Sequence, residues 1–303
     1  MPITSRAFNS NEDFESIMQF LCNTYKTTNS LQNWFPDRFE GSDEVNFPDI
    51  RIWEDMANSD SPLKRKIVAV ASPEKKLRYF IQINPEYSFL EKEIIQWIEN
   101  HCSALKKNPN TKEKLSIVTV EGNSVREEAL TEFGFEHGDI YGILRIRPLD
   151  TPISDVSLPN GFTIRSVQGR SDYEKLAQGV RIVFGHGEWF TAEIIEWITK
   201  RSFYKQDLDL VVVAPDDTIA SFCTFRIDPR SRITQLEPMG THPDYRRLGL
   251  AKAILNEGFK RLKKYNPALI YIGGAADTPA ANRLYEAVGF TEKLEIYFWY
   301  KEI

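Results

Sequence analysis

One strand–turn–helix segment constrains the fold of this chain more than any other part of its sequence. Residues 233–239 (ITQLEPM) have the composition of a strand, and residues 251–262 repeat apolar side chains at the i, i+3, i+4, i+7 spacing of an amphipathic helix. The turn between them (HPDYRRLGLA, 242–251) brings two arginines and Gly249 to the start of the helix. Unpaired N–H groups and the helix dipole favour an anion there, and a glycine lets it approach the backbone closely. The segment therefore predicts a cradle for a pyrophosphate group.

Two common phosphate-binding patterns are missing from the sequence. It contains neither a phosphate loop that ends in glycine, lysine and serine or threonine, nor the dinucleotide pattern G-x-G-x-x-G. The turn instead resembles the coenzyme-A signature R/Q-x-x-G-x-G/A of the GNAT superfamily of acyl-CoA N-acyltransferases. The positions that match this signature are Arg246, Arg247, Leu248, Gly249, Leu250 and Ala251.

A second block, residues 278–290 (TPAANRLYEAVGF), resembles the second conserved block of the same superfamily. It begins with a Thr-Pro pair suited to the start of a helix and ends with a glycine suited to its close. Asn282 and Tyr285 lie three residues apart and so share one face of that helix. In the superfamily this helix packs beside the pantetheine arm of the cofactor. The two blocks, separated by a strand-like run at 268–272, identify residues 155–303 as a GNAT-like domain.

The first half of the chain carries a weaker copy of the same pattern. The 303 residues are enough for two domains of about 150 residues, and the proline- and aspartate-rich stretch at 145–159 is interpreted as the linker. The string NPEY at 84–87 corresponds to HPDY at 242–245, and the Gly-Phe pair at 134–135 corresponds to the one that ends the second block. The two correspondences have nearly the same offset along the chain, which favours a tandem duplication over coincidence.

The first copy lacks the residues that would bind the cofactor. Carboxylates stand in place of the glycine and the alanine of the signature, and they would repel a pyrophosphate at the start of a helix. The resemblance implies an α/β (α+β) protein of two tandem GNAT-like domains, each a mixed, mostly antiparallel splayed sheet flanked by helices. Residues 1–148 are the degenerate copy without the coenzyme-A signature, and residues 155–303 are the catalytic copy. The aligned replacements are Ser88, Phe89, Glu91 and Glu93 in the turn, and Glu127 and Leu130 for Asn282 and Tyr285.

The resemblance also implies direct acyl transfer, without a covalent enzyme intermediate. An amine attacks the thioester of acetyl-CoA, a base removes its proton, and an acid protonates the departing thiolate. Tyr285 is the candidate acid, because a well-placed phenol can protonate a thiolate. Glu237, on the strand beside the cofactor, is the candidate base acting through water. The structural alternatives are that Tyr285 only packs with a hydrogen-bonded hydroxyl and that Glu237 faces outward from its strand.

The cofactor contacts follow from the same resemblance. Backbone groups of Met239, Gly240 and Thr241 are expected to bind the pantetheine amides as an added strand would. The turn that ends at Ala251 should hold the pyrophosphate, chiefly through N–H groups, and Asn282 should reach the pantetheine arm.

Residues for the acceptor are less clearly marked. His186 lies in a loop that touches the acceptor in the family, although a loop histidine is often simply solvated, and His242 is expected to begin the turn rather than act in catalysis. Three aromatic residues either line an acceptor pocket or belong to the core: Trp189, Phe190 and Trp197.

The composition of the chain limits the classes of partner that we expect. The net charge of −5 argues against nucleic acid or a membrane surface as partner, and three cysteines without paired spacing indicate neither a metal site nor a disulfide framework. With no apolar leader, a cytoplasmic monomer or homodimer is expected. The expected donor is acetyl-CoA without a metal, and the expected acceptor is an amine of a small molecule or peptide. A non-catalytic acyl-CoA-binding regulatory module and transfer of a longer acyl group are the alternatives.

Overall fold

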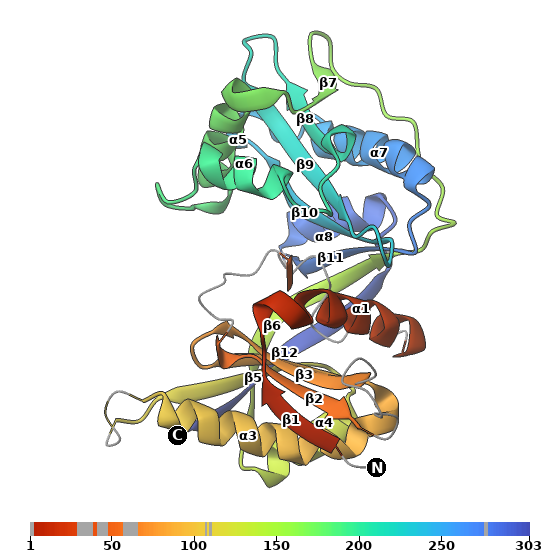
Figure 1. Cartoon of the computed structure of the whole chain (residues 1–303). Helices are drawn as coiled ribbons and strands as arrows, with labels where there is room; N and C mark the ends of the chain where they lie inside the picture. The colour runs from red at the N-terminus through yellow and green to blue at the C-terminus, as the bar shows by residue number, and fades with distance from the viewer. Residues whose placement is uncertain are drawn as a thin grey trace. The chain divides into compact units, whose positions relative to one another are not determined.

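The computed structural model describes residues 3–28, 39–40, 48–56, 66–106, 108, 111–275 and 278–303. Its contacts divide the chain into two compact units (Figure 1). The N-terminal unit consists of Met1–Tyr141 together with Leu294–Ile303, and the C-terminal unit is Gly142–Lys293. Residues 1–148 and 155–303 remain our proposed limits for the two copies of the duplication.

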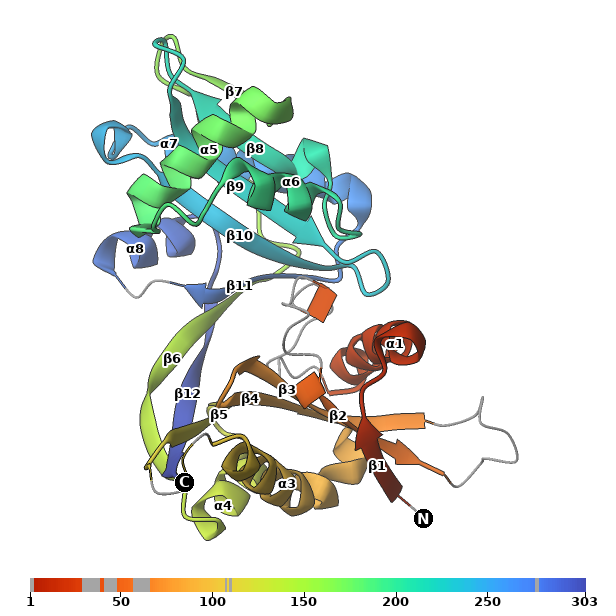
Figure 2. The ribbon, with the colours of Figure 1, turned by 60° about the vertical axis from the view of Figure 1, so that its left-hand side comes forward.

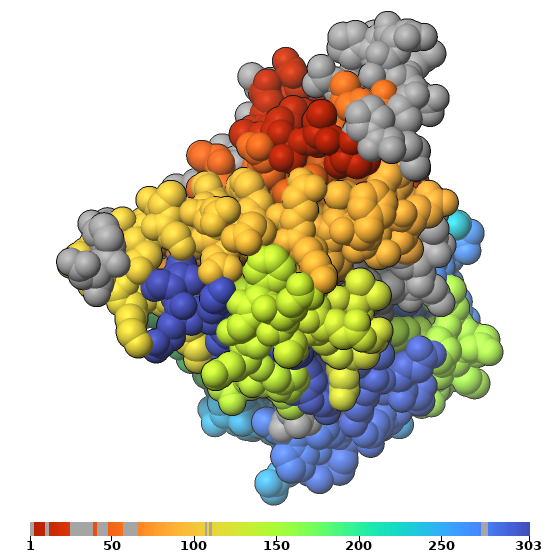
Figure 3. Space-filling model, turned by 90° about the horizontal axis from the view of Figure 1, so that it is seen from below, coloured from red at the N-terminus to blue at the C-terminus, as the bar shows by residue number. Residues whose placement is uncertain are grey.

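The N-terminal unit is a mixed sheet with helices on both faces (Figure 2). Its strand order is β1-β2-β3-β4-β5-β12-β6, in which β4 and β5 are parallel and the other pairs with a determined register are antiparallel. Helices α3 and α4 lie side by side on one outer surface (Figure 3). Its strands are β1 (Ile3–Ala7), β2 (Arg51–Asp55), β3 (Lys66–Lys75), β4 (Arg78–Ile83), β5 (Lys114–Val120), β12 (Glu292–Glu302) and the start of β6 (Glu136–Arg147). Its helices are α1 (Ser10–Thr28), η3 (Pro85–Leu90), α3 (Glu91–Ala104) and α4 (Ser124–Glu132).

The C-terminal unit repeats this arrangement with the strand order β6-β11-β10-β9-β8-β7. Helices α5 and α6 pack on one face of the sheet, and α7 and α8 pack on the other. Only β10 and β11 run parallel among its registered pairs. The strands are β7 (Thr163–Ser166), β8 (Asp209–Val213), β9 (Ile219–Ile227), β10 (Ile233–Thr241) and β11 (Leu269–Ala275). The helices are α5 (Gly169–Phe184), α6 (Ala192–Thr199), η4 (Gln206–Leu208), η5 (Pro243–Tyr245), α7 (Leu250–Leu262), η6 (Lys263–Tyr265) and α8 (Pro279–Ala287).

The last strand of each copy completes the sheet of the other unit. The end of β6 pairs with β11, with Arg145 opposite Ile272, and β12 pairs with β5 from Ile296 to Glu302. Strand β12 ends the second copy in the sequence, yet its registered partner, β5, is in the N-terminal unit. An alternating sequence indicates a strand without saying which strand it pairs with.

The interpretation of 145–159 as a linker is wrong at its start, because Arg145 and Arg147 belong to β6 and are buried. Both guanidinium groups have hydrogen-bond acceptors inside the unit, which is what allows a charged side chain to be buried. Arg147 donates to the carbonyl of Val288 (Nε to O, 2.9 Å) and to that of Thr151 (Nη2 to O, 2.9 Å). Arg145 donates to the side chain of Asn282.

The duplicated strings fold in the same way. Asn84 Oδ1 accepts from the N–H of Glu86 at 3.2 Å, and His242 Nδ1 accepts from the N–H of Asp244 at 3.3 Å. Each residue thereby caps a short 3-10 helix that has proline in its first turn. The prediction that His242 begins the turn is confirmed.

Candidate functional site

The parallel strands β10 and β11 separate soon after they meet. They are paired only where Ile233–Gln235 lies beside Leu269–Tyr271, and β10 then continues to Thr241 along β9. A bulge between Leu236 and Met239 interrupts the pairing with β9. The edge of β10 that follows Gln235 is therefore not paired with β11, which leaves an opening in the sheet.

A cavity of about 950 Å³ lies at this opening, entirely within the C-terminal unit. Its walls come from α5 and α6 on one face of the sheet and from α7 and α8 on the other. It therefore connects the two faces along the edge of β10. The β10 residues that line it run from Leu236 to Thr241, and Ile272 and Gly273 of β11 lie across the opening.

The predicted anion cradle forms one end of this cavity. Gly249 is the N-cap of α7 with φ 78°, Arg247 has φ 66°, and a Cβ built on Gly249 would meet no atom within 4 Å. The glycine thus serves the turn and keeps the space before the helix open. Arg246 Nε donates to the carbonyl of Thr241 at 3.3 Å, so this side chain folds back onto β10. Leu248 is 45% exposed and does not line the cavity, whereas the other signature residues do.

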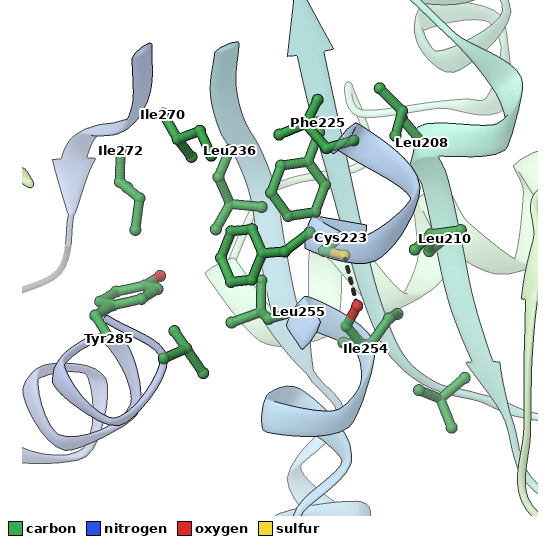
Figure 4. Packing of buried hydrophobic residues seen from close by; sticks show 14 of the residues in the cluster. Leu208, Leu210, Cys223, Phe225, Leu236, Ile254, Leu255, Ile270, Ile272 and Tyr285 are labelled. Carbon is green, nitrogen blue, oxygen red and sulfur yellow. Dashed lines mark hydrogen bonds between the residues drawn. The ribbon is translucent and has the colours of Figure 1, made fainter. Parts of the chain in front are cut away.

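Helix α8 is built as the sequence indicates. Thr278 Oγ1 accepts from the N–H of Ala281 at 3.2 Å, and Gly289 follows the helix with φ 93°. Tyr285 is 8% exposed and lines the cavity, and its hydroxyl points between Ile272 and Leu236 (Figure 4). Burial raises the pKa of the Tyr285 phenol, so the hydroxyl carries its proton at neutral pH.

Asn282 shares a helix face with Tyr285 but does not line the cavity. Its amide oxygen accepts from Arg145 of β6, and the same guanidinium lies over the ring of Tyr285. The expected contact of Asn282 with pantetheine remains a prediction.

The other end of the cavity has a row of polar side chains on the face that α5 and α6 cover. Asp209 begins β8 and pairs in register with Thr224 of β9, and Arg226 pairs in register with Gln235 of β10. Gln235 Nε2 donates to Glu237, and Arg226 Nη1 lies 3.9 Å from the same carboxylate. Glu237 thus faces the cavity, as its proposed role requires.

Asp209 also belongs to this row, although its sequence context did not single it out. It is 3% exposed, and its two oxygens accept from Thr224 Oγ1 at 2.8 Å and from the Tyr204 hydroxyl at 3.0 Å. Burial raises its pKa to about 6, although Thr224, Tyr204 and Arg226 act in the opposite direction. The only signal in the sequence is a carboxylate placed directly before the apolar run LVVV.

Only one of the three aromatic residues near α6 meets either expectation, and it is Phe190. His186 and Phe190 line the cavity and are 5.7 Å apart, ring centre to ring centre. Trp189 and Trp197 are 63% and 40% exposed, so they belong neither to the core nor to the cavity wall.

Comparison with known proteins agrees with this geometry. Residues 178–290 match the acetyltransferase (GNAT) family. The chain also superposes on a tandem GNAT protein from the clavulanic acid biosynthesis pathway with a TM-score of 0.69 and 13% identity, covering 99% of this chain and 98% of that one. Residues of the C-terminal unit therefore match the GNAT acetyltransferase family, and the whole chain has the fold of a tandem GNAT protein.

Two further proteins are similar to this chain. A GCN5-related N-acetyltransferase from Sphaerobacter thermophilus superposes with a TM-score of 0.68 and 16% identity, over 99% of this chain and 95% of that one. A mycothiol acetyltransferase from Saccharopolyspora erythraea is 25% identical over 160 residues, which are 50% of this chain and 52% of the relative. The chain therefore spans about half the length of this curated relative.

The N-terminal unit has a buried ion pair at positions that align with cavity-lining residues of the C-terminal unit. Glu91, the counterpart of Gly249, lies at the start of α3 and is buried against Arg126 of α4. Arg126 donates to this carboxylate from Nε at 3.0 Å and from Nη2 at 2.9 Å, and from Nη1 to the carbonyl of Ile81 on β4 at 3.1 Å. Protein atoms thus bridge the elements that correspond to α7, α8 and β10. Glu93 accepts from Trp53 Nε1 at 2.7 Å.

The part of the chain that the structure describes contains neither a membrane-spanning helix nor a metal-binding group. None of its helices has the length and apolar character needed to cross a membrane. No three histidine, cysteine or acidic side chains within it come together in a group that could hold a metal ion.

Proposed function

We propose that the protein is an N-acetyltransferase that transfers the acetyl group of acetyl-CoA to a primary amine of a small molecule or peptide. The observation that carries this proposal is the single cavity, which joins an anion cradle at α7 to a polar row under α5 and α6. Two substrates that enter from opposite ends would meet beside the opening between β10 and β11. The relative whose name specifies an acetyltransferase supports the same reaction class.

Acetyl-CoA would occupy the end of this cavity that carries the anion cradle. The edge of β10 at Met239, Gly240 and Thr241 would pair with the pantetheine amides, because β11 does not occupy it. The N–H groups that begin α7 would receive the pyrophosphate, with Arg246 and Arg247 beside them. A side chain at Gly240 is excluded, because its Cβ would lie 2.4 Å from the Phe222 ring.

The chemistry needs one base and one acid. The amine nitrogen attacks the thioester carbon, Glu237 takes a proton from that nitrogen through water, and the carbon–sulfur bond breaks. Tyr285 gives its proton to the sulfur, which leaves as the thiol of coenzyme A. The raised pKa of Tyr285 suits a group that must hold a proton until the sulfur needs it.

The direct test measures binding and turnover separately. Calorimetry with acetyl-CoA should give saturable binding, and a thiol-reactive dye should detect coenzyme A released when an amine is added. Binding without release across a broad panel of amines would instead indicate the non-catalytic acyl-CoA-binding module. Absence of binding would exclude both functions.

A further inference from the structure

The acceptor end of the cavity has a polar floor and apolar walls. Three charged side chains lie on the floor: Asp209, Arg226 and Glu237. The walls come from α5, α6 and the loop between them. The apolar lining residues are Leu176, Val180, Val183, Phe184, Phe190, Ile195 and Ile198.

We propose that Asp209 binds the ammonium group of the acceptor, and that the acceptor is a primary amine carried on an apolar, uncharged body. This inference rests on the proposed acetyltransferase function and assigns the substrate class of the same site. It makes Asp209 a residue that determines specificity, while Glu237 keeps the role of base. Glu237 takes the ammonium proton through water, which frees the nitrogen lone pair for attack, and the second proton that the nitrogen loses after attack returns to Tyr285 once the phenol has protonated the sulfur.

Asp209 has the hydrogen-bonding capacity for this task. Its carboxylate accepts one hydrogen bond from Thr224 and one from Tyr204, on different oxygens. A carboxylate has about four lone-pair sites, so it can accept further donors. The two neighbours hold it against the cavity floor, because Thr224 lies opposite it in the sheet and Tyr204 follows α6.

The charges on the floor favour a cation. Arg226 is the only guanidinium or ammonium group among the described residues that line this end, and it lies 3.9 Å from Glu237. Two carboxylates therefore share one cation, and His186 and Tyr204 are the other ionisable groups among the described residues at this end. An ammonium group would supply the missing positive charge in a site where an unpaired charge is costly.

The same charges disfavour a carboxylate on the acceptor. Arg226 already faces Glu237, and the apolar walls supply no second cation. Arg246, Arg247 and Lys252 lie at the opposite end, where the donor is placed. An amino acid would thus bring an unpaired negative charge into the cavity, whereas an amine with an aromatic or aliphatic body would not.

The protonation state of Asp209 should make the affinity for the amine depend on pH. The pKa of Asp209 is influenced by four residues: Arg226 on β9, Asp172 on α5, Thr224 and Tyr204. Asp209 in turn helps to raise the pKa of Cys223. Burial outweighs their combined effect and raises the pKa of Asp209 to about 6. The carboxylate is then ionised at pH 7.5 and protonated at pH 5, so amine affinity should fall at least fivefold over that interval.

The first experiment compares two acceptors that differ by one carboxylate. With the full chain and saturating acetyl-CoA at pH 7.5, 2-phenylethylamine should give a kcat/KM at least tenfold above that of phenylalanine. Equal values, or a preference for phenylalanine, would overturn the inference while leaving acetyl transfer established. This comparison needs no variant, so it is independent of how any substitution folds.

The second experiment tests Asp209 itself. Asp209→Asn should raise the KM for 2-phenylethylamine at least tenfold, leave the KM for acetyl-CoA unchanged and remove the pH dependence of amine affinity near 6. The matched control is Asp228→Asn, a buried carboxylate of the same unit that does not line the cavity and should change neither KM. An unchanged amine KM and pH profile in Asp209→Asn would refute the assignment. Absence of acetyl-CoA binding by the unmodified protein would instead refute the proposed function.

Discussion

The guanidinium carbon of Arg145 lies 5.7 Å from the centre of the Tyr285 ring, and Nη2 of the same side chain donates to the amide oxygen of Asn282. Arg145 is fully buried on β6, and its Nε and Nη1 have no acceptor among the residues that the structure describes. Burial raises the pKa of Tyr285, and the nearby cation opposes part of that rise. Arg145 thus connects β6 to both α8 residues that the sequence singled out.

Arg145→Met should slow the reaction without displacing the cofactor. Loss of the cation lets the pKa of Tyr285 rise further, which weakens it as an acid. A loss of about 1.4 kcal/mol, within the range of a buried cation–π pair, corresponds to about a tenfold fall in kcat. Steady-state kinetics checks this against Arg147→Met, another buried arginine of β6 that contacts Phe259 and backbone carbonyls. Equal losses of kcat in both variants would show a general effect of disturbing β6.

Tyr285→Phe should separate binding from chemistry. The ring packing on Phe290 is kept, while the proton donor is lost. A positioned general acid typically contributes about 10²- to 10⁴-fold, so we expect kcat to fall at least 100-fold with the affinity for acetyl-CoA unchanged. Turnover at the unmodified rate would remove Tyr285 from the role of acid.

Asp209 should make stability depend on pH in a definite direction. Its pKa is raised by burial from 3.8 to about 6, so folding favours the protonated form. The resulting contribution to stability is complete below about pH 4 and is lost as the pH rises through 6, and it amounts to about 3 kcal/mol. The free energy of unfolding, measured relative to Asp209→Asn, should therefore be higher at pH 4 than at pH 7. A difference that does not change with pH would contradict a titrating buried carboxylate at this position.

The ion pair of the N-terminal unit should contribute to stability rather than to activity. Arg126→Met leaves the buried carboxylate of Glu91 without its partner, which typically costs about 3–5 kcal/mol of unfolding free energy. The double variant Arg126→Met with Glu91→Leu should recover most of this loss, because no uncompensated charge remains. Denaturant unfolding checks both variants. If the single variant were as stable as the double variant, the buried pair would not explain how this copy is closed.

Local signals in the sequence were sufficient to predict the turn that forms the cradle and the helix α8. Apolar spacing, the capping residue and the glycine act over a few positions, so the predicted helices and the turn between β10 and α7 are found where they were expected. The role of His242 was also predictable, since Asn84 occupies the same position in the other copy.

Features that depend on distant partners could not be predicted. The sequence of β12 indicates a strand but not its pairing with β5, and Arg145 looked like part of a linker because its partners lie more than a hundred residues away. Asp209 was missed for the same reason, since only the folded sheet places it beside Thr224 and Tyr204. The burial of Glu91 could not be predicted either, because it depends on Arg126, which lies 35 residues further along the chain.

The central claim is that each chain has one acetyl-CoA site, located in the C-terminal unit. Gly249→Glu places in the cradle the residue that Glu91 supplies in the other copy, and it should abolish binding through charge and bulk. Gly169→Glu is the matched control, because Gly169 also has a positive φ at the start of a helix and space around it. Calorimetric titration with acetyl-CoA should give one site per chain for the unmodified protein and for Gly169→Glu, and none for Gly249→Glu. Two sites per chain, or binding that survives in Gly249→Glu, would contradict this account.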